Sequence, residues 1–600
     1  MEFNKEQQLA IETNLGAFSI IASPGAGKST VLVHRVQNLV NTYKVLQEDI
    51  LCITFTSNTR KNLQQKLKGM FLGDVLVHTF HSLAGKLLVQ EGVVKRESGD
   101  NVDSNTGLNK YALMAKFKVI CKDLKNRDYD DIMSVISYNK SFMRGYNDEF
   151  VEKESKFSDN DLRKFYKIYE DYKTSINYLD FDDLLLECNK LMDLHPEIEY
   201  KYVLVDEFQD TNLIQNVLLT KWCKSRNLFV VFDYRQSLYK FNGANPEYCM
   251  NFYKDWNATV INLDINYRST TNIVNNSNKF IRNYFGDYKF YSDGIPNSKV
   301  NGQIKLLTNS NRVEEAQKVC NEVQRLIAAG EDPDQIAILY RLNSHSEMVE
   351  SLFKAEGIEY DIKGDSSFFK RKEIRAIMAV LKLVENSSDD EAFDILFATR
   401  LDPLKFFNKK DKELIDRHKM KNDLSYYETL STITFPESWK NRNCKVFINN
   451  IFDLKIKKDK SHSIAALIDL AKQGFKIKDY LTENYQDEEV RDRLQSIEVL
   501  KQFIRGDDLT KFIEFTEESS EKKKTKDTHG VKMMSVHASK GCEWKNVIII
   551  GIEAEKFPHS KSDMLSEVML FFVAITRPTD NLWISQIGQS NIFVEEYFSY

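Results

Sequence analysis

The sequence predicts an α/β protein with two parallel-sheet cores, each carrying a mostly helical insertion. Two observations support this fold class: short apolar runs alternate with helix-like stretches, and they fall into two sets, each interrupted by a long, charged, helix-like segment. The first set lies at 17–22, 50–54, 75–78, 202–205, 228–232 and 259–263. The second set lies at 303–307, 336–340, 547–551 and 582–585.

These positions divide the 600-residue chain into four parts, the number of domains that its length suggests. We expect a first core from residues 1–88 and 178–262 with an insertion at 89–177. We expect a second core from residues 263–381 and 531–600 with an insertion at 382–530.

The insertions lack nucleotide-binding motifs and are expected to be helical. In the first insertion, five apolar residues recur at helical spacing: Phe165, Ile168, Tyr169, Tyr172 and Ile176. We expect them to form the core of a helix bundle and not a ligand site. The second insertion ends in the charged segment 517–530, which we expect to be a solvated linker.

The segment Ala17–Thr30, AFSIIASPGAGKST, predicts a phosphate-binding loop between a strand and a helix. It follows the pattern G-x-x-x-x-G-K-[ST], except that Ala22 takes the place of the first glycine. Glycines let the backbone N–H groups curl around phosphate oxygens, while Lys28 would neutralise the β- and γ-phosphates and Ser29 would bind Mg²⁺. The alternative is a glycine turn beside a surface lysine. The predicted nucleotide-binding residues of the loop are Ala22, Ser23, Pro24, Gly25, Ala26, Gly27, Lys28, Ser29 and Thr30.

The segment Val203–Asn212, VLVDEFQDTN, places two carboxylates after a buried strand. Asp206 would hold Mg²⁺ through its water shell, and Glu207 would orient or deprotonate the attacking water. Together with the phosphate loop, this segment predicts that the chain binds ATP and Mg²⁺.

Composition limits the other classes of function. The chain is 42% hydrophobic and 28% charged, as expected for a soluble globular protein. Its net charge of −5 neither requires nor excludes a polyanionic partner, because nucleic acids bind to local grooves. The eight cysteines form no C-x-x-C pair, which argues against a zinc site and suits a cytoplasmic protein. We expect no signal peptide and no membrane association.

The motifs resemble, in order along the chain, those of the UvrD/Rep/PcrA-type helicases of superfamily 1. The matching strings are FNKEQQLAI (Phe3–Ile11), ITFTSN (Ile53–Asn58), HTFHSLA (His78–Ala84), LDFDDLL (Leu179–Leu185), VVFDYRQSLYKFNGA (Val230–Ala244), LDINYRST (Leu263–Thr270), IAILYRLNSHSE (Ile336–Glu347), FFKRKEIR (Phe368–Arg375), MSVHASKGCEW (Met534–Trp544) and FVAITRP (Phe572–Pro578). The resemblance implies two RecA-like cores. It also implies an ATP-dependent 3′→5′ translocase on single-stranded DNA that unwinds tailed duplexes in repair, replication or defence.

The resemblance also implies roles around the nucleotide. Gln7 would read adenine, Tyr267 would stack on it, Glu543 would contact the ribose and Gln236 would sense the γ-phosphate. Arg268 and Arg577 would act as arginine fingers, and Arg35 would lie near the site. A surface position for Gln7 and ordinary salt bridges for the two fingers are the alternatives.

A further set of residues matches positions that meet nucleic acid in the family. Tyr239 and Phe241 would stack on bases, and their closeness in sequence to Gln236 would couple ATP to the strand. The other predicted contacts are Thr56, Asn58, Phe80, His81, Arg341, Asn343, His537 and Ser539. For Phe80, a position in the core is the alternative.

The sequence departs from the family pattern in the string Val230–Ala244 and just before the string Phe572–Pro578. Tyr234 and Arg235 follow Asp233, Asn242 stands where many relatives carry arginine, and Val568 and Met569 replace a frequent basic pair. Three alternatives stay open on other grounds: a motor that acts only with a partner nuclease or repair complex, which the divergent second insertion allows, a strand sensor without ATPase activity, and an RNA substrate.

Overall fold

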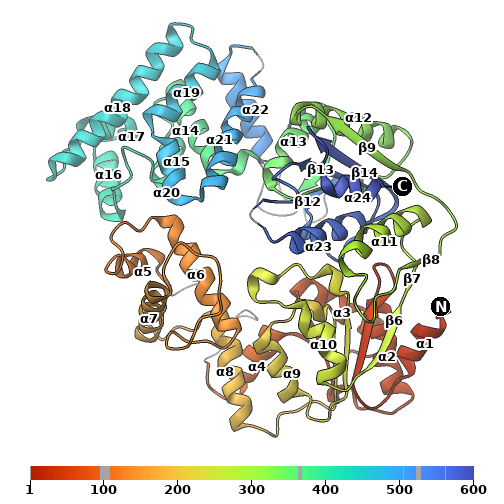
Figure 1. Cartoon of the computed structure of the whole chain (residues 1–600). Helices are drawn as coiled ribbons and strands as arrows, with labels where there is room; N and C mark the ends of the chain where they lie inside the picture. Colours follow the sequence, from red (N-terminus) through yellow and green to blue (C-terminus); the bar gives the residue numbers. More distant parts are fainter. Residues whose placement is uncertain are drawn as a thin grey trace.

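The computed structural model describes residues 2–94, 108–362, 368–504, 506–521, 529–560 and 562–599. Within these residues the chain forms two six-stranded parallel sheets (Figure 1). The predicted α/β class with two parallel-sheet cores is therefore confirmed. We call each sheet with its flanking helices the first core and the second core.

The first sheet contains all six strands predicted from the first set of apolar runs. Their order is β3-β2-β4-β5-β1-β6. The strands are β1 (Phe18–Ala22), β2 (Ile50–Thr54), β3 (Leu76–Thr79), β4 (Tyr202–Val205), β5 (Leu228–Phe232) and β6 (Thr259–Leu263). Because parallel strands end at the same edge, the segments after β1, β4 and β5 are brought together there.

The second sheet contains the four predicted strands and two that were not predicted. Its order is β11-β12-β10-β13-β14-β9. The strands are β9 (Ile304–Asn309), β10 (Ile336–Tyr340), β11 (Tyr360–Ile362), β12 (Val531–Ser535), β13 (Trp544–Glu553) and β14 (Pro578–Ile587). Strand β11 is only three residues long, and β12 (VKMMS) has one β-branched residue, so neither gave a clear strand signal. A short pair, β7 (Ile265–Asn266) and β8 (Ile295–Pro296), follows β6.

Helices flank both sheets in the way that crossover connections require. Those of the first core are α1 (Lys5–Glu12), α2 (Lys28–Asn41), α3 (Ser57–Gly69), α4 (Phe80–Gln90), α8 (Phe181–Leu194), α9 (Leu213–Trp222) and α10 (Pro246–Asp255). Those of the second core are α11 (Thr271–Phe285), α12 (Arg312–Ala328), α13 (Glu347–Ala355), α23 (Met564–Ile575) and α24 (Ile592–Phe598).

The described part of the first insertion is a small helix bundle with a core of its own. It contains α5 (Lys110–Phe117), α6 (Asn126–Ser141) and α7 (Asp159–Ser175). Phe165 and Tyr169 are buried as predicted, with Ile168 and Tyr172 packed against them. Ile176 is 38% exposed, so its predicted core position is wrong, because it follows the last residue of α7.

The second insertion is larger and shares its core with the second sheet. Its helices are α14 (Lys372–Glu385), α15 (Asp390–Thr399), α16 (Lys409–Asn422), α17 (Tyr426–Thr432), α18 (Ser438–Asp459), α19 (Ile464–Gly474), α20 (Ile477–Asn484), α21 (Asp487–Gln502) and α22 (Leu509–Glu521). One cluster of buried side chains runs from Ile548 in β13 to Phe447 in α18. Helix α14 crosses the predicted boundary at residue 382 and packs on α15, α18 and α19.

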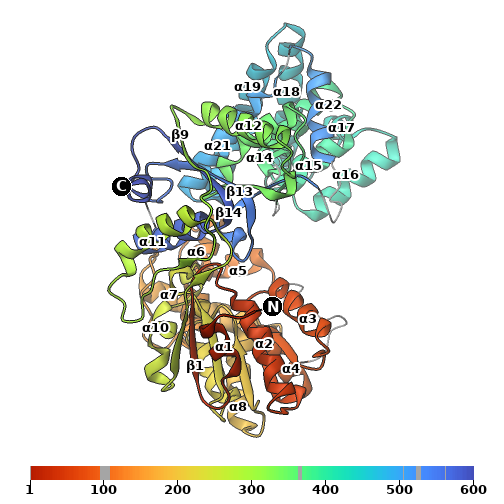
Figure 2. The ribbon, with the colours of Figure 1, turned by 90° about the vertical axis from the view of Figure 1, so that its right-hand side faces the viewer.

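The two insertions touch one another on one side of the molecule (Figures 1 and 2). Arg127 in α6 donates to Asp487 at 2.6 Å. The predicted linker begins within α22, and its middle, 522–528, lies outside the described residues. Among the described helices, none has the length and apolarity needed to cross a bilayer.

Candidate nucleotide and nucleic-acid site

The phosphate loop is held open by hydrogen bonds that occupy its carbonyl groups. The carbonyls of Pro24, Gly25 and Ala26 accept from Asn266 Nδ2, Tyr267 N and Gln7 Nε2, at 2.8, 3.0 and 3.1 Å. These three carbonyl groups are therefore already hydrogen-bonded within the protein. The first N–H groups of α2, from Lys28 onward, have no acceptor within the helix and suit an anion.

Gly25 and Gly27 are required by this geometry, since they have φ angles of 72° and 82°. A side-chain carbon on Gly25 would lie 2.6 Å from Cβ of Arg268. Ala22 ends β1, and the side chain of Ser23 accepts a hydrogen bond from Arg235. Ser29 and Thr30 lie in the first turn of α2, next to Lys28.

The two predicted carboxylates follow β4 directly. Glu207 has a φ of 54°, an uncommon value for glutamate, and this turn lets consecutive acidic residues face the same site. Gln209 donates to Glu207 at 2.6 Å and accepts from the backbone of Asp233 at 3.2 Å, which links the ends of β4 and β5. Sequence reasoning quoted Gln209 but gave it no role.

The electrostatics of the carboxylates connect them to the phosphate loop. Burial raises the pKa of Asp206, and the neighbouring Glu207 adds to the effect. Burial acts in the same sense on Glu207, but Lys28 and then Lys540 outweigh it and hold the pKa of Glu207 below its ordinary value. Lys28 is thus close enough to both groups to act on them.

Two arginines of the second core meet the first core at the loop. Tyr267 and Arg268 follow β7, and Arg268 Nε donates to Glu543 at 2.6 Å. Arg577 is 2% exposed and donates to Gln236 Oε1 at 3.4 Å and to the carbonyl of Val573 at 2.8 Å. Burial, followed by the nearby Arg268, lowers the pKa of Arg577 to about 9.

Lys540 is a second cation that crosses between the cores, and sequence reasoning did not assign it. Its Nζ donates to Asp210 at 2.5 Å and to the carbonyl of Gln236 at 2.9 Å, and it lies 5.4 Å from the ring centre of Tyr239. Its position in the string Met534–Trp544 was the available signal. Spacing along the sequence could not show that this lysine reaches the other core.

Gln7 and Tyr267 lie together beside the loop. Gln7 is buried in a capping box with Asn4 and donates to Ala26, while Asn4 donates to the hydroxyl of Tyr267 at 3.0 Å. The ring of Tyr267 is 45% exposed and available to a base. The surface alternative for Gln7 does not hold.

Arg35 contacts the end of α1. Its guanidinium donates to the carbonyls of Ile11 and Asn14, at 3.4 and 2.9 Å, and packs over the rings of Phe18 and Phe229. These contacts hold the guanidinium against the end of α1, and a role of Arg35 near the nucleotide stays a prediction.

Tyr239 lies beside Lys540 and packs on Phe55 with ring centres 4.7 Å apart. Phe241 follows in the 3₁₀ turn η4 (Lys240–Asn242), and its side chain lies outside the described residues. Thr56 and Asn58 are exposed at the start of α3, where the Thr56 hydroxyl caps the helix.

His81 and Phe181 form a stacked pair that was only half predicted. Their ring centres are 3.6 Å apart with an interplanar angle of 18°, and Phe181 is 56% exposed. The neighbouring Phe80 is 3% exposed and stacks on Trp222 inside the core. Phe80 therefore occupies the core position that was the alternative, and its contact with the strand stays a prediction.

The remaining predicted residues lie at the carboxyl edge of the second sheet. Arg341 makes a paired contact with Glu567 at 2.9 and 3.2 Å, and it contributes, after burial, to lowering the pKa of His537 to about 4. Asn343 is exposed. Ser539 is fully buried and donates to the carbonyl of Val536, and its contact with the strand stays a prediction.

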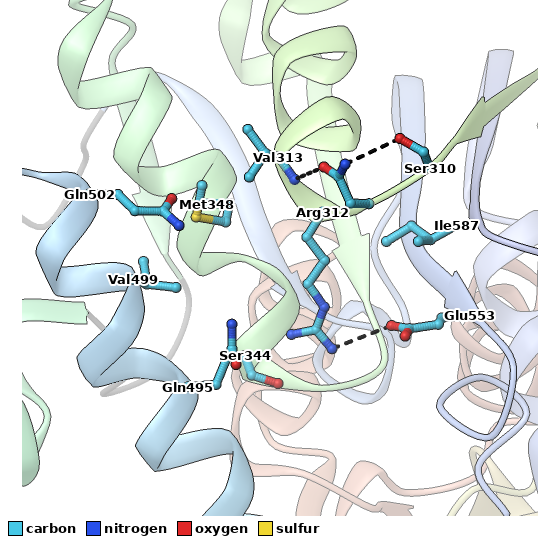
Figure 3. A pocket seen from close by; sticks show the side chains of 11 residues that line it. Ser310, Arg312, Val313, Ser344, Met348, Gln495, Val499, Gln502, Glu553 and Ile587 are labelled. Carbon is cyan, nitrogen blue, oxygen red and sulfur yellow. Dashed lines mark hydrogen bonds and ion pairs between the residues drawn. The ribbon is translucent and has the colours of Figure 1, made fainter.

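A cavity of about 330 Å³ lies elsewhere, between the start of α12, helix α13 and helix α21 (Figure 3). Arg312, Ser344 and Gln495 line it, and Arg312 pairs with Glu553 at 3.4 Å. None of the residues predicted to bind nucleotide or nucleic acid lines this cavity.

Comparison with known proteins gives matches that together span both cores. Residues 3–257 match the family described as the UvrD/REP helicase N-terminal domain, and residues 261–589 match the UvrD-like helicase C-terminal domain. The chain is 28% identical to the ATP-dependent DNA helicase PcrA of Bacillus subtilis, over 98% of this chain and 83% of the relative. Proteins of the same name from Staphylococcus epidermidis and Staphylococcus aureus are also 28% identical, over 98% of this chain and 84% of each relative.

Proposed function

Because the chain belongs to the UvrD/REP helicase family, we propose that it is an ATP-dependent DNA helicase that moves 3′→5′ on single-stranded DNA and separates duplexes. The observation that carries this proposal is the pair of cations that cross between the cores. Arg577 contacts Gln236, and Lys540 contacts both Asp210 and Gln236. Lys28 of the phosphate loop influences Glu207, on which Arg577 and Lys540 also act.

This arrangement supports a motor in which ATP closes the seam between the cores. The γ-phosphate would meet Lys28 from the first core and Arg577 from the second. An arginine finger stabilises the charge of the transition state and is worth about 10³–10⁵ in rate. Hydrolysis would then weaken the attraction between the cores and let them separate.

Asp206 and Ser29 fit a Mg²⁺ ion. A hydroxyl in the first turn of α2 and a buried carboxylate are ligands that this cation accepts, and Asp206 lies beside a second carboxylate, Glu207. The ion would neutralise phosphate charge during transfer.

The link to the strand is supported by Lys540 and Tyr239. The same ammonium group touches Asp210, four residues after Asp206, and lies over the ring of Tyr239. Tyr239 and the stacked pair of His81 and Phe181 offer aromatic faces to bases, each worth about 1–3 kcal/mol. Movement of Lys540 with the second core would therefore change its contacts with both Asp210 and the ring of Tyr239.

The test combines ATPase and unwinding assays. We expect single-stranded DNA to stimulate ATP hydrolysis, and we expect duplexes with a 3′ tail to be unwound and those with a 5′ tail to remain paired. Lys28→Ala should abolish hydrolysis and serves as the inactive control. Unwinding from the 5′ tail alone would overturn the polarity, and an ATPase indifferent to DNA would overturn the coupling.

A further inference from the structure

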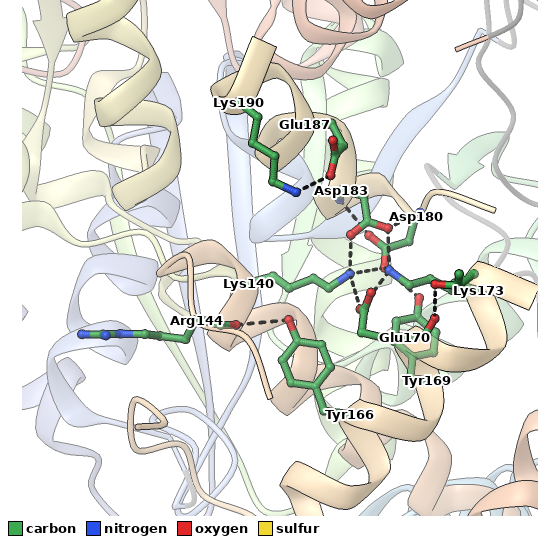
Figure 4. A network of polar contacts seen from close by, with 11 residues as sticks. Lys140, Arg144, Tyr166, Tyr169, Glu170, Lys173, Asp180, Asp183, Glu187 and Lys190 are labelled. Atoms are coloured by element: carbon green, nitrogen blue, oxygen red, sulfur yellow. Dashed lines mark hydrogen bonds and ion pairs between the residues drawn. The ribbon is translucent and has the colours of Figure 1, made fainter. Parts of the chain in front are cut away.

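A buried cluster of five charged groups joins the first insertion to the first core (Figure 4). We call it the charge cluster; it consists of Lys140 in α6, Glu170 and Lys173 in α7, and Asp180 and Asp183 at the start of α8. Lys140 contacts Asp180, Asp183 and Glu170 at 2.5, 2.6 and 3.0 Å. Lys173 contacts the same three carboxylates at 2.9, 2.5 and 2.9 Å.

The members of the cluster depend on one another. The side chains of Lys140 and Lys173 are 2% and 3% exposed, so neither ammonium group can exchange its partners for water. Burial alone would lower the pKa of Lys140, but Asp180 and Asp183 more than compensate and raise it well above its ordinary value. Because an unpaired buried charge is costly, the groups keep one common geometry. The lysines also occupy the place that a metal ion would need among the three carboxylates.

The cluster fixes the first turn of α8. Asp180 caps this helix, and Asp180 and Asp183 exchange hydrogen bonds through their backbone N–H groups in a capping box. Phe181 lies between these two residues in sequence, and its exposed ring stacks on His81. The orientation of the Phe181 ring is therefore set by the two carboxylates that Lys140 and Lys173 hold.

The same end of α6 also meets the segment that carries Tyr239. Ser141, next to Lys140, packs so closely on Gly243 that a side-chain carbon there would lie 2.1 Å from the serine hydroxyl oxygen. Gly243 directly follows η4. Two consecutive residues of α6 thus contact the supports of two separate aromatic groups.

From these contacts we propose that Lys140 is a positioning residue for strand binding, which holds the Phe181–His81 stack in place through Asp180 and Asp183. The inference rests on the proposed function, since it assumes that Phe181 and His81 receive a base. By this inference the end of α6 fixes the position of the Phe181–His81 stack relative to Tyr239.

The experiment measures binding of single-stranded DNA that carries 2-aminopurine, whose fluorescence reports stacking. Lys140→Met is compared with Lys190→Met, a control on α8 whose lysine makes an exposed pair with Glu187 at 2.7 Å. We expect Lys140→Met to weaken binding about 10-fold and to reduce the stacking signal, while Lys190→Met changes neither. The 10-fold figure corresponds to about 1.4 kcal/mol, within the range of one stacked base.

A double-mutant cycle separates positioning from general damage. If Lys140 acts through Phe181, Lys140→Met should add little to the loss already caused by Phe181→Ala. Additive losses, or full binding by Lys140→Met, would overturn the proposal. Circular dichroism and thermal denaturation check the fold. If Lys140→Met does not fold, Asp183→Asn, which keeps the shape and removes one charge, carries the same test. Failure of the wild-type chain to bind DNA would instead overturn the proposed function.

Discussion

Replacing Arg577 by methionine should raise stability and lower activity at the same time. The guanidinium is buried between the cores, and it donates to Gln236, to the Thr576 hydroxyl and to backbone carbonyls. It has no carboxylate within ion-pair distance among the described residues. An anion such as the γ-phosphate would complete this environment, so the free protein holds a cation that is stabilised only when nucleotide binds.

The magnitude follows from the pKa. Burial, with Arg268 as the next cause, lowers the pKa of Arg577 from 12.5 to about 9. This change corresponds to about 5 kcal/mol against the charged group, as an upper value. The carbonyls of Val573 and Cys542 lose a donor in Arg577→Met, at about 1 kcal/mol each. We therefore expect the free energy of unfolding to rise by about 2–3 kcal/mol, while kcat falls by about 10³-fold or more.

The pH dependence gives the prediction a sign. Because the pKa of Arg577 is lower in the folded protein, the unfolded chain binds this proton more tightly. Below pH 9 the folded wild-type protein therefore carries the full cost of the buried charge. Its free energy of unfolding rises as the pH rises through 9. The advantage of Arg577→Met should accordingly shrink between pH 8 and pH 10.

Thermal denaturation at several pH values and steady-state ATPase assays provide the measurements. Arg577→Lys, which keeps the charge, is the matched control and should not gain stability. A lower melting temperature for Arg577→Met, or a loss of ATP affinity as large as the loss of kcat, would refute the reasoning, because either result would mean that the arginine supports the fold.

Two further substitutions probe the loop and the strand contact. Gly25→Ala should abolish ATP binding because the new carbon would collide with Arg268. Gly16, which has a φ of 106° and open space around it, provides the control. Gly16→Ala carries only the backbone cost of about 1–2 kcal/mol and should bind ATP normally. Equal affinity of both variants, measured by nucleotide titration, would contradict this. Tyr239→Ala should raise the DNA concentration for half-maximal ATPase stimulation about 5- to 100-fold and spare nucleotide binding; unchanged stimulation would show that the ring does not meet the strand.

Local sequence patterns predicted the features that depend on local physics. All six strands of the first sheet were recognisable because buried parallel strands are continuous apolar runs. The convergence of Lys28, Asp206 and Glu207 followed from the rule that parallel strands end at one edge. Strand β12 was not predicted because its pairing with β10 and β11, and not its residue types, makes it a strand.

Features that depend on distant contacts could not be predicted. Phe80 and His81 are neighbours in sequence, yet Phe80 meets Trp222 in the core and His81 meets Phe181 at the surface. Likewise, Ser539 is buried while the adjacent Lys540 extends into the other core. Which of two adjacent residues faces a partner depends on where a remote segment lies, and the order of motifs does not contain that information.

The buried cluster that runs from β13 into α18 has a practical consequence for anyone who truncates this chain. Excising the second insertion would expose the apolar face of a sheet whose residues Ile548 and Ile550 are fully buried, and we expect the remaining protein to aggregate. The described helices of the first insertion bury most of their apolar side chains in a cluster of their own, with Met143 packed on the first core, so we expect a variant shortened there to expose less apolar surface.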